Sequence, residues 1–158
     1  MLLKASCQCQ KIRYELETDL YYPYMICYCS ICRKTNGAPF GVNIKGDLDN
    51  LKIINGKDYI KTYSAKDCER HFCSKCGSPL YITDHRWPDG IWPNAASIDT
   101  ALPKPPEYQQ IFLDDQVPWF KPDIPGKKFS GYPKWSIDEY HQHLKNSNLD
   151  NETNNNEI

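Results

Sequence analysis

The sequence predicts one domain of mainly β structure with a short helix near its C-terminal end. Short runs rich in β-branched and aromatic residues alternate with Gly, Asn, Asp and Lys turns through most of the chain, which is typical of strands. Apolar residues at helical spacing occur in one late segment, and prolines crowd the segment before it. The length of 158 residues suits one domain with a real core and is too short for two ordinary ones.

The clearest strand is KIRYELE (11–17), in which Ile12, Tyr14 and Leu16 alternate with polar residues. Shorter runs of the same kind predict four more strands: FGVNIK (40–45), LKII (51–54), YIKTY (59–63) and PLYIT (79–83). Because turn residues separate these runs, we expect a mostly antiparallel arrangement.

Prolines crowd the segment between about 101 and 133. Proline cannot donate to a strand ladder, so this segment is expected to run as extended loops around at most one strand near IFL (111–113). We interpret it as a cover on a single domain that spans residues 3–133, and not as a second domain.

The best helix signal follows this cover. Ser136 and Glu139 form a capping-box pattern, and Ile137, Tyr140 and Leu144 recur at helical spacing. We therefore expect a C-terminal helix over residues 134–146. The Asn-rich tail, residues 147–158, has almost nothing to bury and is expected to be disordered.

The composition of the chain limits the classes of partner that the protein is expected to bind. The formal net charge is −1 and no run of Lys or Arg interleaves with aromatic residues, which argues against nucleic acid and anionic membranes. The start of the chain lacks the apolar region of a secretory signal, and no apolar run approaches the roughly 20 residues that span a bilayer. We expect a cytoplasmic protein, in which eight cysteines are metal ligands rather than four disulfides.

The strongest single motif is FCSKCG, which contains Cys73 and Cys76. A C-x-x-C followed by glycine makes a tight knuckle whose two sulfurs point at one ion, and the glycine can take a positive φ. The knuckle needs a second pair of ligands. Cys7 and Cys9 are the other compact pair of cysteines in the sequence that does not belong to a larger group. Four thiolates would then close a structural zinc site; the alternative is that Cys7 and Cys9 are ordinary strand thiols.

A second group, CYCSIC, offers only Cys27, Cys29 and Cys32, whereas a structural zinc site takes four ligands. Cys68 stands apart in the charged segment SAKDCERH, which has turn character. We expect Cys68 to be a free thiol. The alternative is that it fills the open position and turns the middle group into a closed site.

The motifs SCQC, CYCSICRKTNGAPF and FCSKCGS resemble, in order and spacing, the glutathione-dependent formaldehyde-activating enzyme (GFA) family, which includes the centromere protein V-like proteins. The resemblance covers roughly residues 3–120 and implies an Mss4-like, mainly β fold with two zinc ions. It implies a structural zinc on Cys7, Cys9, Cys73 and Cys76. It also implies a catalytic zinc on Cys27, Cys29 and Cys32. Many relatives have histidine where this chain has Tyr28, and many have one before the run from Tyr108 to Phe112.

Zinc with three thiolates and one open position can bind a substrate thiol and lower its pKa. The predicted function is therefore that of a carbon–sulfur lyase type of enzyme acting on a thiol adduct such as S-(hydroxymethyl)glutathione, with a small-molecule thiol as its partner. Arg33 and Lys34 either offset the charge of the centre or are surface charges. Phe40, Tyr63 and Trp92 either line a pocket or belong to the core.

The alternative function is a non-enzymatic, zinc-stabilised module that binds a protein or nucleic acid, in which both metals are structural. The unfilled ligand position favours the enzyme, because it would cost a purely structural site some affinity.

Overall fold

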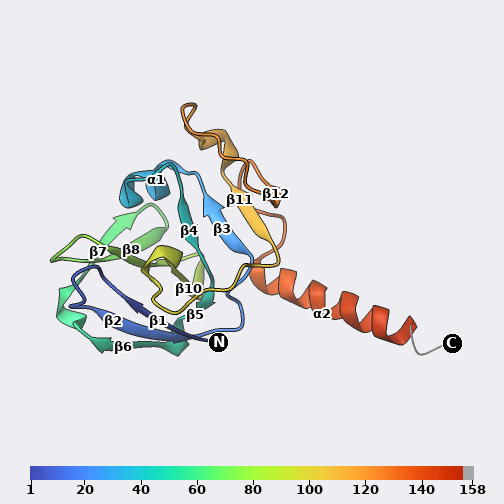
Figure 1. Ribbon diagram of the computed structural model, residues 1–158, viewed down its shortest axis with the longest axis horizontal. Coiled ribbons are helices and arrows are strands. Elements are labelled where there is room, and N and C mark those ends of the chain that lie inside the picture. Colours follow the sequence, from blue (N-terminus) through green and yellow to red (C-terminus); the bar gives the residue numbers. More distant parts are fainter. Residues whose placement is uncertain (155–158) are drawn as a thin grey trace.

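The computed structural model describes the backbone of residues 1–154 and the side chains of residues 1–146. As predicted, the fold is mainly β, with mostly antiparallel pairing and a C-terminal helix (Figure 1). The described strands form three sheets. None of the described helices is long and apolar enough to cross a membrane.

The first sheet has three antiparallel strands in the order β1-β2-β6. They are β1 (Leu2–Ser6), β2 (Arg13–Glu17) and β6 (Leu51–Asn55). Alternate residues of β1 and β2 are buried, so that Leu3, Tyr14 and Leu16 enter the core while the residues between them face outward. This alternation is the one that the sequence of KIRYELE predicts.

The second sheet has five antiparallel strands in the order β5-β10-β9-β8-β7. They are β5 (Gly46–Asp47), β10 (Trp87–Pro93), β9 (Pro79–Asp84), β8 (Cys68–Cys73) and β7 (Ile60–Ala65). The segment around Cys68, expected to be a turn, instead makes the hairpin β7–β8, with the turn at Lys66 (φ 57°) and Asp67.

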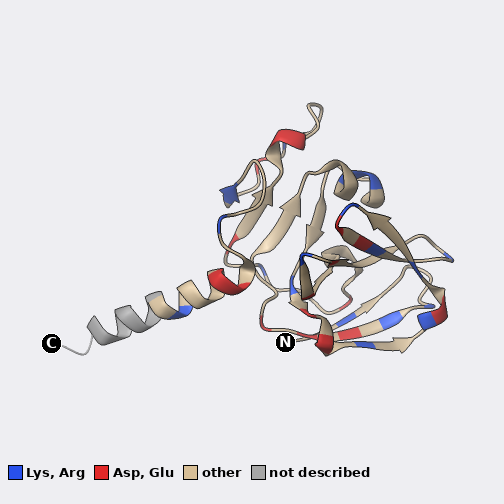
Figure 2. Ribbon diagram, turned by 180° about the vertical axis from the view of Figure 1, so that it is seen from behind, with Lys and Arg blue, Asp and Glu red and all other residues tan. Residues whose placement is uncertain are grey.

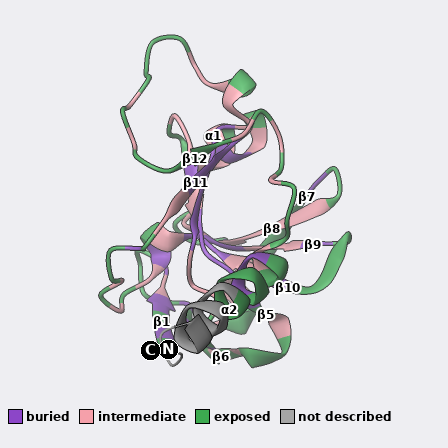
Figure 3. Ribbon diagram, turned by 90° about the vertical axis from the view of Figure 1, so that its right-hand side faces the viewer, coloured by how far each residue is buried: buried purple, intermediate pink, exposed green. Residues whose placement is uncertain are grey.

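The third sheet has the order β12-β11-β3-β4. Its strands are β12 (Lys127–Lys128), β11 (Tyr108–Ile111), β3 (Tyr24–Cys27) and β4 (Gly41–Asn43). All four residues of β3 are buried, and Figure 3 shows buried strand segments next to β11. Strand β3 lies between β11, which is parallel to it, and antiparallel β4 (Figure 1). This sheet carries the middle cysteine motif at the end of β3.

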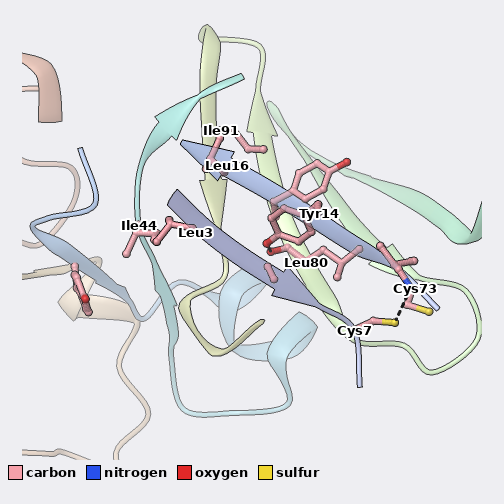
Figure 4. Packing of buried hydrophobic residues seen from close by; sticks show 12 residues of the cluster. Leu3, Cys7, Tyr14, Leu16, Ile44, Cys73, Leu80 and Ile91 are labelled. Atoms are coloured by element: carbon pink, nitrogen blue, oxygen red, sulfur yellow. Dashed lines mark hydrogen bonds between the residues drawn. The ribbon is translucent and has the colours of Figure 1, made fainter. Parts of the chain in front are cut away.

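The main core packs the first sheet against the second. Its largest fully buried side chains include Tyr14, Leu3, Leu16 and Leu80, and Figure 4 places Cys7 and Cys73 at one end of the same cluster. The Tyr14 hydroxyl donates to the Leu80 carbonyl at 3.1 Å, so the polar end of this buried ring is satisfied.

Short helical turns connect the strands. A seven-residue helix, α1 (Ser30–Asn36), follows β3 and ends at Gly37, which takes the left-handed conformation (φ 59°). Four 3-10 turns complete the connections: η1 (Leu48–Asn50), η2 (Lys57–Tyr59), η3 (Ala95–Ser97) and η4 (Leu113–Asp115).

The proline-rich cover differs from its prediction. It contributes two strands, β11 and β12, and β11 ends at Ile111 instead of running through IFL. Phe112 takes a left-handed conformation (φ 57°), and η4 begins at the next residue. The backbone therefore leaves the sheet one residue after Ile111, which a pattern of apolar residues does not reveal.

The C-terminal helix α2 (Ile137–Asn154) begins as predicted. Ser136 and Glu139 cap each other reciprocally: the Ser136 amide donates to the Glu139 carboxylate at 2.7 Å and the Glu139 amide to the Ser136 hydroxyl at 3.2 Å. The expected helix end at 146 was wrong, because α2 continues to Asn154. A helix once begun gains one backbone hydrogen bond for each residue that is added. Of the tail expected to be disordered, 147–154 continue this helix, and 155–158 lie outside the described residues.

Helix α2 is held to the body by an ion pair at its first turn. The Lys45 amine, whose side chain is 8% exposed, donates to both oxygens of Asp138 at 2.7 and 2.8 Å. The buried charge of Lys45 is thereby paired with a carboxylate of α2. Figure 1 shows the helix leaving the body beyond this turn.

Replacing Asp138 with alanine should lower the free energy of unfolding by about 1–2 kcal/mol, since it strands a buried lysine charge while Asp138 itself is half exposed. Chemical denaturation measures the change. Asp114→Ala, at an exposed site in η4, is the matched control and should change stability little. Equal effects of the two substitutions would contradict a specific role of the pair.

Candidate metal centres

Two turns that are far apart in sequence bring four cysteines together. Cys7 and Cys9 lie in the turn between β1 and β2, and Cys73 and Cys76 lie at the turn between β8 and β9. Their four sulfurs all lie within 4.8 Å of one another, with Cys7–Cys9 at 3.5 Å and Cys9–Cys73 at 3.8 Å. These are the cysteines that the sequence pairs at one structural site, and such a group could hold a metal ion.

The local backbone explains why these sulfurs converge. Gly77 takes a positive φ of 75° and its amide donates to the Cys73 carbonyl at 2.8 Å, which closes the expected knuckle. Backbone amides also point at the sulfurs: Ile12 donates to the Cys7 sulfur at 3.3 Å and Lys75 to the Cys73 sulfur at 3.4 Å. Amide donors of this kind stabilise thiolates, which are the form that binds metal.

The middle motif forms a second group. Cys27 ends β3, Cys29 is the N-cap of α1, and Cys32 lies in its first turn, with the three sulfurs within 4.8 Å of one another. The Cys32 amide donates to the Cys29 sulfur at 3.4 Å. The strand-to-helix turn thus gathers three thiols within six residues, and this group also could hold a metal ion.

Crowding gives the three thiols opposite tendencies to ionise. The pKa of Cys29 is lowered by the hydrogen bond that Cys29 makes with the Cys27 thiol. The pKa of Cys27 is raised by its hydrogen bonds with Cys29 and Cys32, together with burial. A second negative charge at this spacing therefore requires a cation. The donor set fits a metal ion, which would balance several thiolates at once.

Arg70, in β8, supplies a positive charge to this group. Its guanidinium donates to the Cys32 sulfur at 3.1 Å, and its Nε is buried without a hydrogen-bond partner among the described residues. Sequence reasoning missed Arg70 and considered Arg33 and Lys34 instead. Arg33 donates from Nε to the Tyr28 carbonyl at 2.9 Å, while Lys34 is exposed, so Arg33 braces the motif's backbone.

Tyr28, between the first two cysteines, also fixes the motif. It is fully buried, and its hydroxyl donates to the Gln110 side chain in β11 at 2.9 Å. Gln110 in turn donates to the Ile124 carbonyl at 2.8 Å, which joins the motif to the proline-rich cover. This tyrosine faces away from the pocket described next and acts as an anchor.

The three-cysteine group opens on a pocket of about 830 Å³. Its lining comes from the second and third sheets, α1, the proline-rich cover and the start of α2, and includes Cys27, Cys29, Cys32, Arg70, Trp92 and Tyr132. Of the three aromatic candidates, Trp92 lines this pocket, Phe40 packs on Tyr28 with ring centroids 5.7 Å apart, and Tyr63 is exposed. A volume of this size accommodates a small organic molecule.

Cys68 also lines the pocket but lies outside the group of three sulfurs. Its thiol donates to the Ala65 carbonyl at 3.1 Å. The geometry therefore favours the prediction of a free thiol over that of a fourth ligand.

Three comparisons bear on identity. The family model described as "Glutathione-dependent formaldehyde-activating enzyme" matches residues 2–115. The chain belongs to this family. A Halomonas elongata protein that carries the same family name is 39% identical over 153 residues, which cover 91% of this chain and 97% of that protein. The crystal structure of a Rhodobacter sphaeroides protein, 21% identical, superposes with a TM-score of 0.55 over 63% of this chain and 91% of that one, which supports the fold alone.

Replacing Cys73 with serine should unfold or aggregate the domain, because metal held by four thiolates contributes directly to folding free energy. Thermal melting and metal content measure this. Cys68→Ser is the matched control and should melt like the wild type, since its thiol lies outside both groups of sulfurs and no metal contact is expected of it. A Cys73→Ser protein with wild-type melting and full metal content would overturn the assignment.

Proposed function

We propose that this member of the GFA family is a cytoplasmic carbon–sulfur lyase type of enzyme that interconverts glutathione plus formaldehyde with S-(hydroxymethyl)glutathione. The observation that carries the proposal is the three-cysteine group at the wall of the 830 Å³ pocket. A group that presents three sulfurs to a pocket leaves room for a fourth from a substrate, whereas a group of four does not.

Both cysteine groups are proposed to bind zinc, with Cys7, Cys9, Cys73 and Cys76 holding the structural ion. Cys27, Cys29 and Cys32 would hold the catalytic ion. When bound there, zinc supplies a Lewis acid that lowers the pKa of a thiol at its remaining position. Arg70 neutralises part of the thiolate charge through its hydrogen bond to Cys32 and so favours ionisation of a further thiol nearby.

The synthesis step forms one bond and breaks one π bond. The substrate thiolate attacks the formaldehyde carbon, the carbon–sulfur bond forms, and the carbonyl π electrons move to oxygen, which then takes a proton. The reverse step returns the proton, reforms the carbonyl and releases the thiolate. A hydrogen-bond donor next to the oxygen stabilises the charge that develops on it.

We assign the role of this donor to Tyr132. It lines the pocket, and its hydroxyl accepts a hydrogen bond from Arg86 at 2.9 Å, which leaves its own O–H to donate. Partial desolvation raises the pKa of Tyr132, so the phenol stays protonated at neutral pH. Arg86 is itself held by Asp84 at 2.6 Å and stacks near the rings of Trp87 and Tyr132.

Mild chelation should remove about one zinc equivalent and abolish glutathione binding while the strand content survives, since the middle group closes a short loop and the other group joins distant strands. Metal analysis, calorimetric titration and circular dichroism follow the three quantities. Cys29→Ser should behave in the same way. Loss of both metals together with the structure would make the middle group structural and favour the non-enzymatic module.

Tyr132→Phe should lower kcat for adduct formation by about 10–100-fold with little change in glutathione affinity, because one donor to a developing oxyanion is lost. The rate of formaldehyde consumption with excess glutathione measures it. Tyr63→Phe, at an exposed site outside the pocket, is the control. Equal rates in Tyr132→Phe and wild type would remove Tyr132 from the mechanism.

A further inference from the structure

The floor of the pocket carries two buried side-chain amides on adjacent strands. Met25 in β3 is opposite Asn43 in β4 and opposite Gln109 in β11, so these three residues form one row across the sheet. All three line the pocket. Cys27 lies two residues further along β3 and therefore on the same face.

Asn43 is 5% exposed, and its Oδ1 is buried without a hydrogen-bond partner among the described residues. Gln109 is also 5% exposed, and its side chain makes no hydrogen bond to the described part of the chain. Its neighbour Gln110 points to the other face of the sheet, where both ends of its amide are paired with Tyr28 and Ile124. A buried amide oxygen without a partner is costly, which singles out Asn43 as a ligand-binding group, and Gln109 lines the pocket in the same row.

The charged groups near this row each have a partner, although the Nε of Arg70 makes no hydrogen bond to the described residues. Lys45, two residues beyond Asn43, is bound to Asp138, and Arg70 donates to the Cys32 sulfur. A ligand group that meets the floor therefore meets neutral amides. A carboxylate cannot donate to Asn43 Oδ1, whereas a peptide group offers both an N–H and a carbonyl oxygen.

From this row we propose a subsite: Asn43 and Gln109 bind the peptide groups that flank the thiol of the substrate, so that the site selects cysteinyl peptides over simple thiols. The proposal rests on the function proposed above. Two residues of strand place the row about 7 Å along β3 from Cys27. The amides on either side of a cysteine lie about 3–5 Å from its sulfur, and a hydrogen bond adds about 3 Å, so one ligand can occupy both places.

The test compares thiols with and without an amide. Calorimetric titration of the zinc-loaded full-length protein uses glutathione, N-acetylcysteamine, which has one amide, and 2-mercaptoethanol, which has none. The variants are Asn43→Leu and Gln109→Met, which keep side-chain size and remove the amide. Gln142→Met, exposed on α2, is the matched control. Melting temperature and zinc content show that each variant is folded and loaded.

Each pocket variant should weaken glutathione by about 3–10-fold, which corresponds to one lost hydrogen bond, and leave 2-mercaptoethanol unchanged. N-acetylcysteamine, with its single amide, should be weakened by the same factor in at least one of the two variants. Equal losses for all three thiols, or no loss in Gln109→Met, would overturn the subsite; if Asn43→Leu does not fold, Gln109→Met alone decides. If the wild type shows the predicted selectivity but does not accelerate adduct formation with formaldehyde, the subsite stands and the proposed reaction falls. If the wild type binds no thiol, both fall.

Discussion

The convergence of four sulfurs from two distant turns is the constraint on which the rest of the structure depends. Cys9 and Cys73 are 64 positions apart, yet their sulfurs lie 3.8 Å from each other. This contact joins the hairpin β1–β2 to the hairpin β8–β9 at one end of the main core. Strand β8 then extends from Cys73 back to Arg70 and Cys68, so whatever fixes the four-sulfur group also positions Arg70 against the Cys32 sulfur.

The pocket combines a locally formed group of sulfurs with walls that come from elsewhere. Cys27, Cys29 and Cys32 are gathered by one strand-to-helix turn, and their arrangement needs little beyond that turn. Arg70, Tyr132 and Gln109 reach the same space from β8, the proline-rich cover and β11. The sulfurs can therefore bind an ion with modest consequences for the fold, while the choice of ligand depends on tertiary structure.

Local patterns predicted the features that depend on nearby residues. Three features could be predicted: the alternation of Ile12, Tyr14 and Leu16, the Ser136–Glu139 cap, and both cysteine groups. Periodicity, capping and the spacing of metal ligands each depend on residues that lie close together in the sequence. The parallel pairing of β3 with β11 could not, since it joins segments separated by most of the chain. Arg70, Tyr132, Asn43 and Gln109 acquire their roles through register and packing. Helix α1 was not predicted, although Cys29 at its N-cap and Gly37 at its C-cap bound it. The spacing of the cysteines indicated a metal site, and the segment was therefore not considered as a helix.

The central claim is that the three-cysteine group holds a metal ion whose remaining position accepts a substrate thiol. NMR of the cadmium-substituted protein tests it most directly, because cadmium replaces zinc at thiolate sites and its resonance reports the ligands. The account predicts two resonances, of which glutathione shifts one and Cys29→Ser removes the same one, while the other is unaffected by either. A single resonance, or two that glutathione leaves unchanged, would contradict the account.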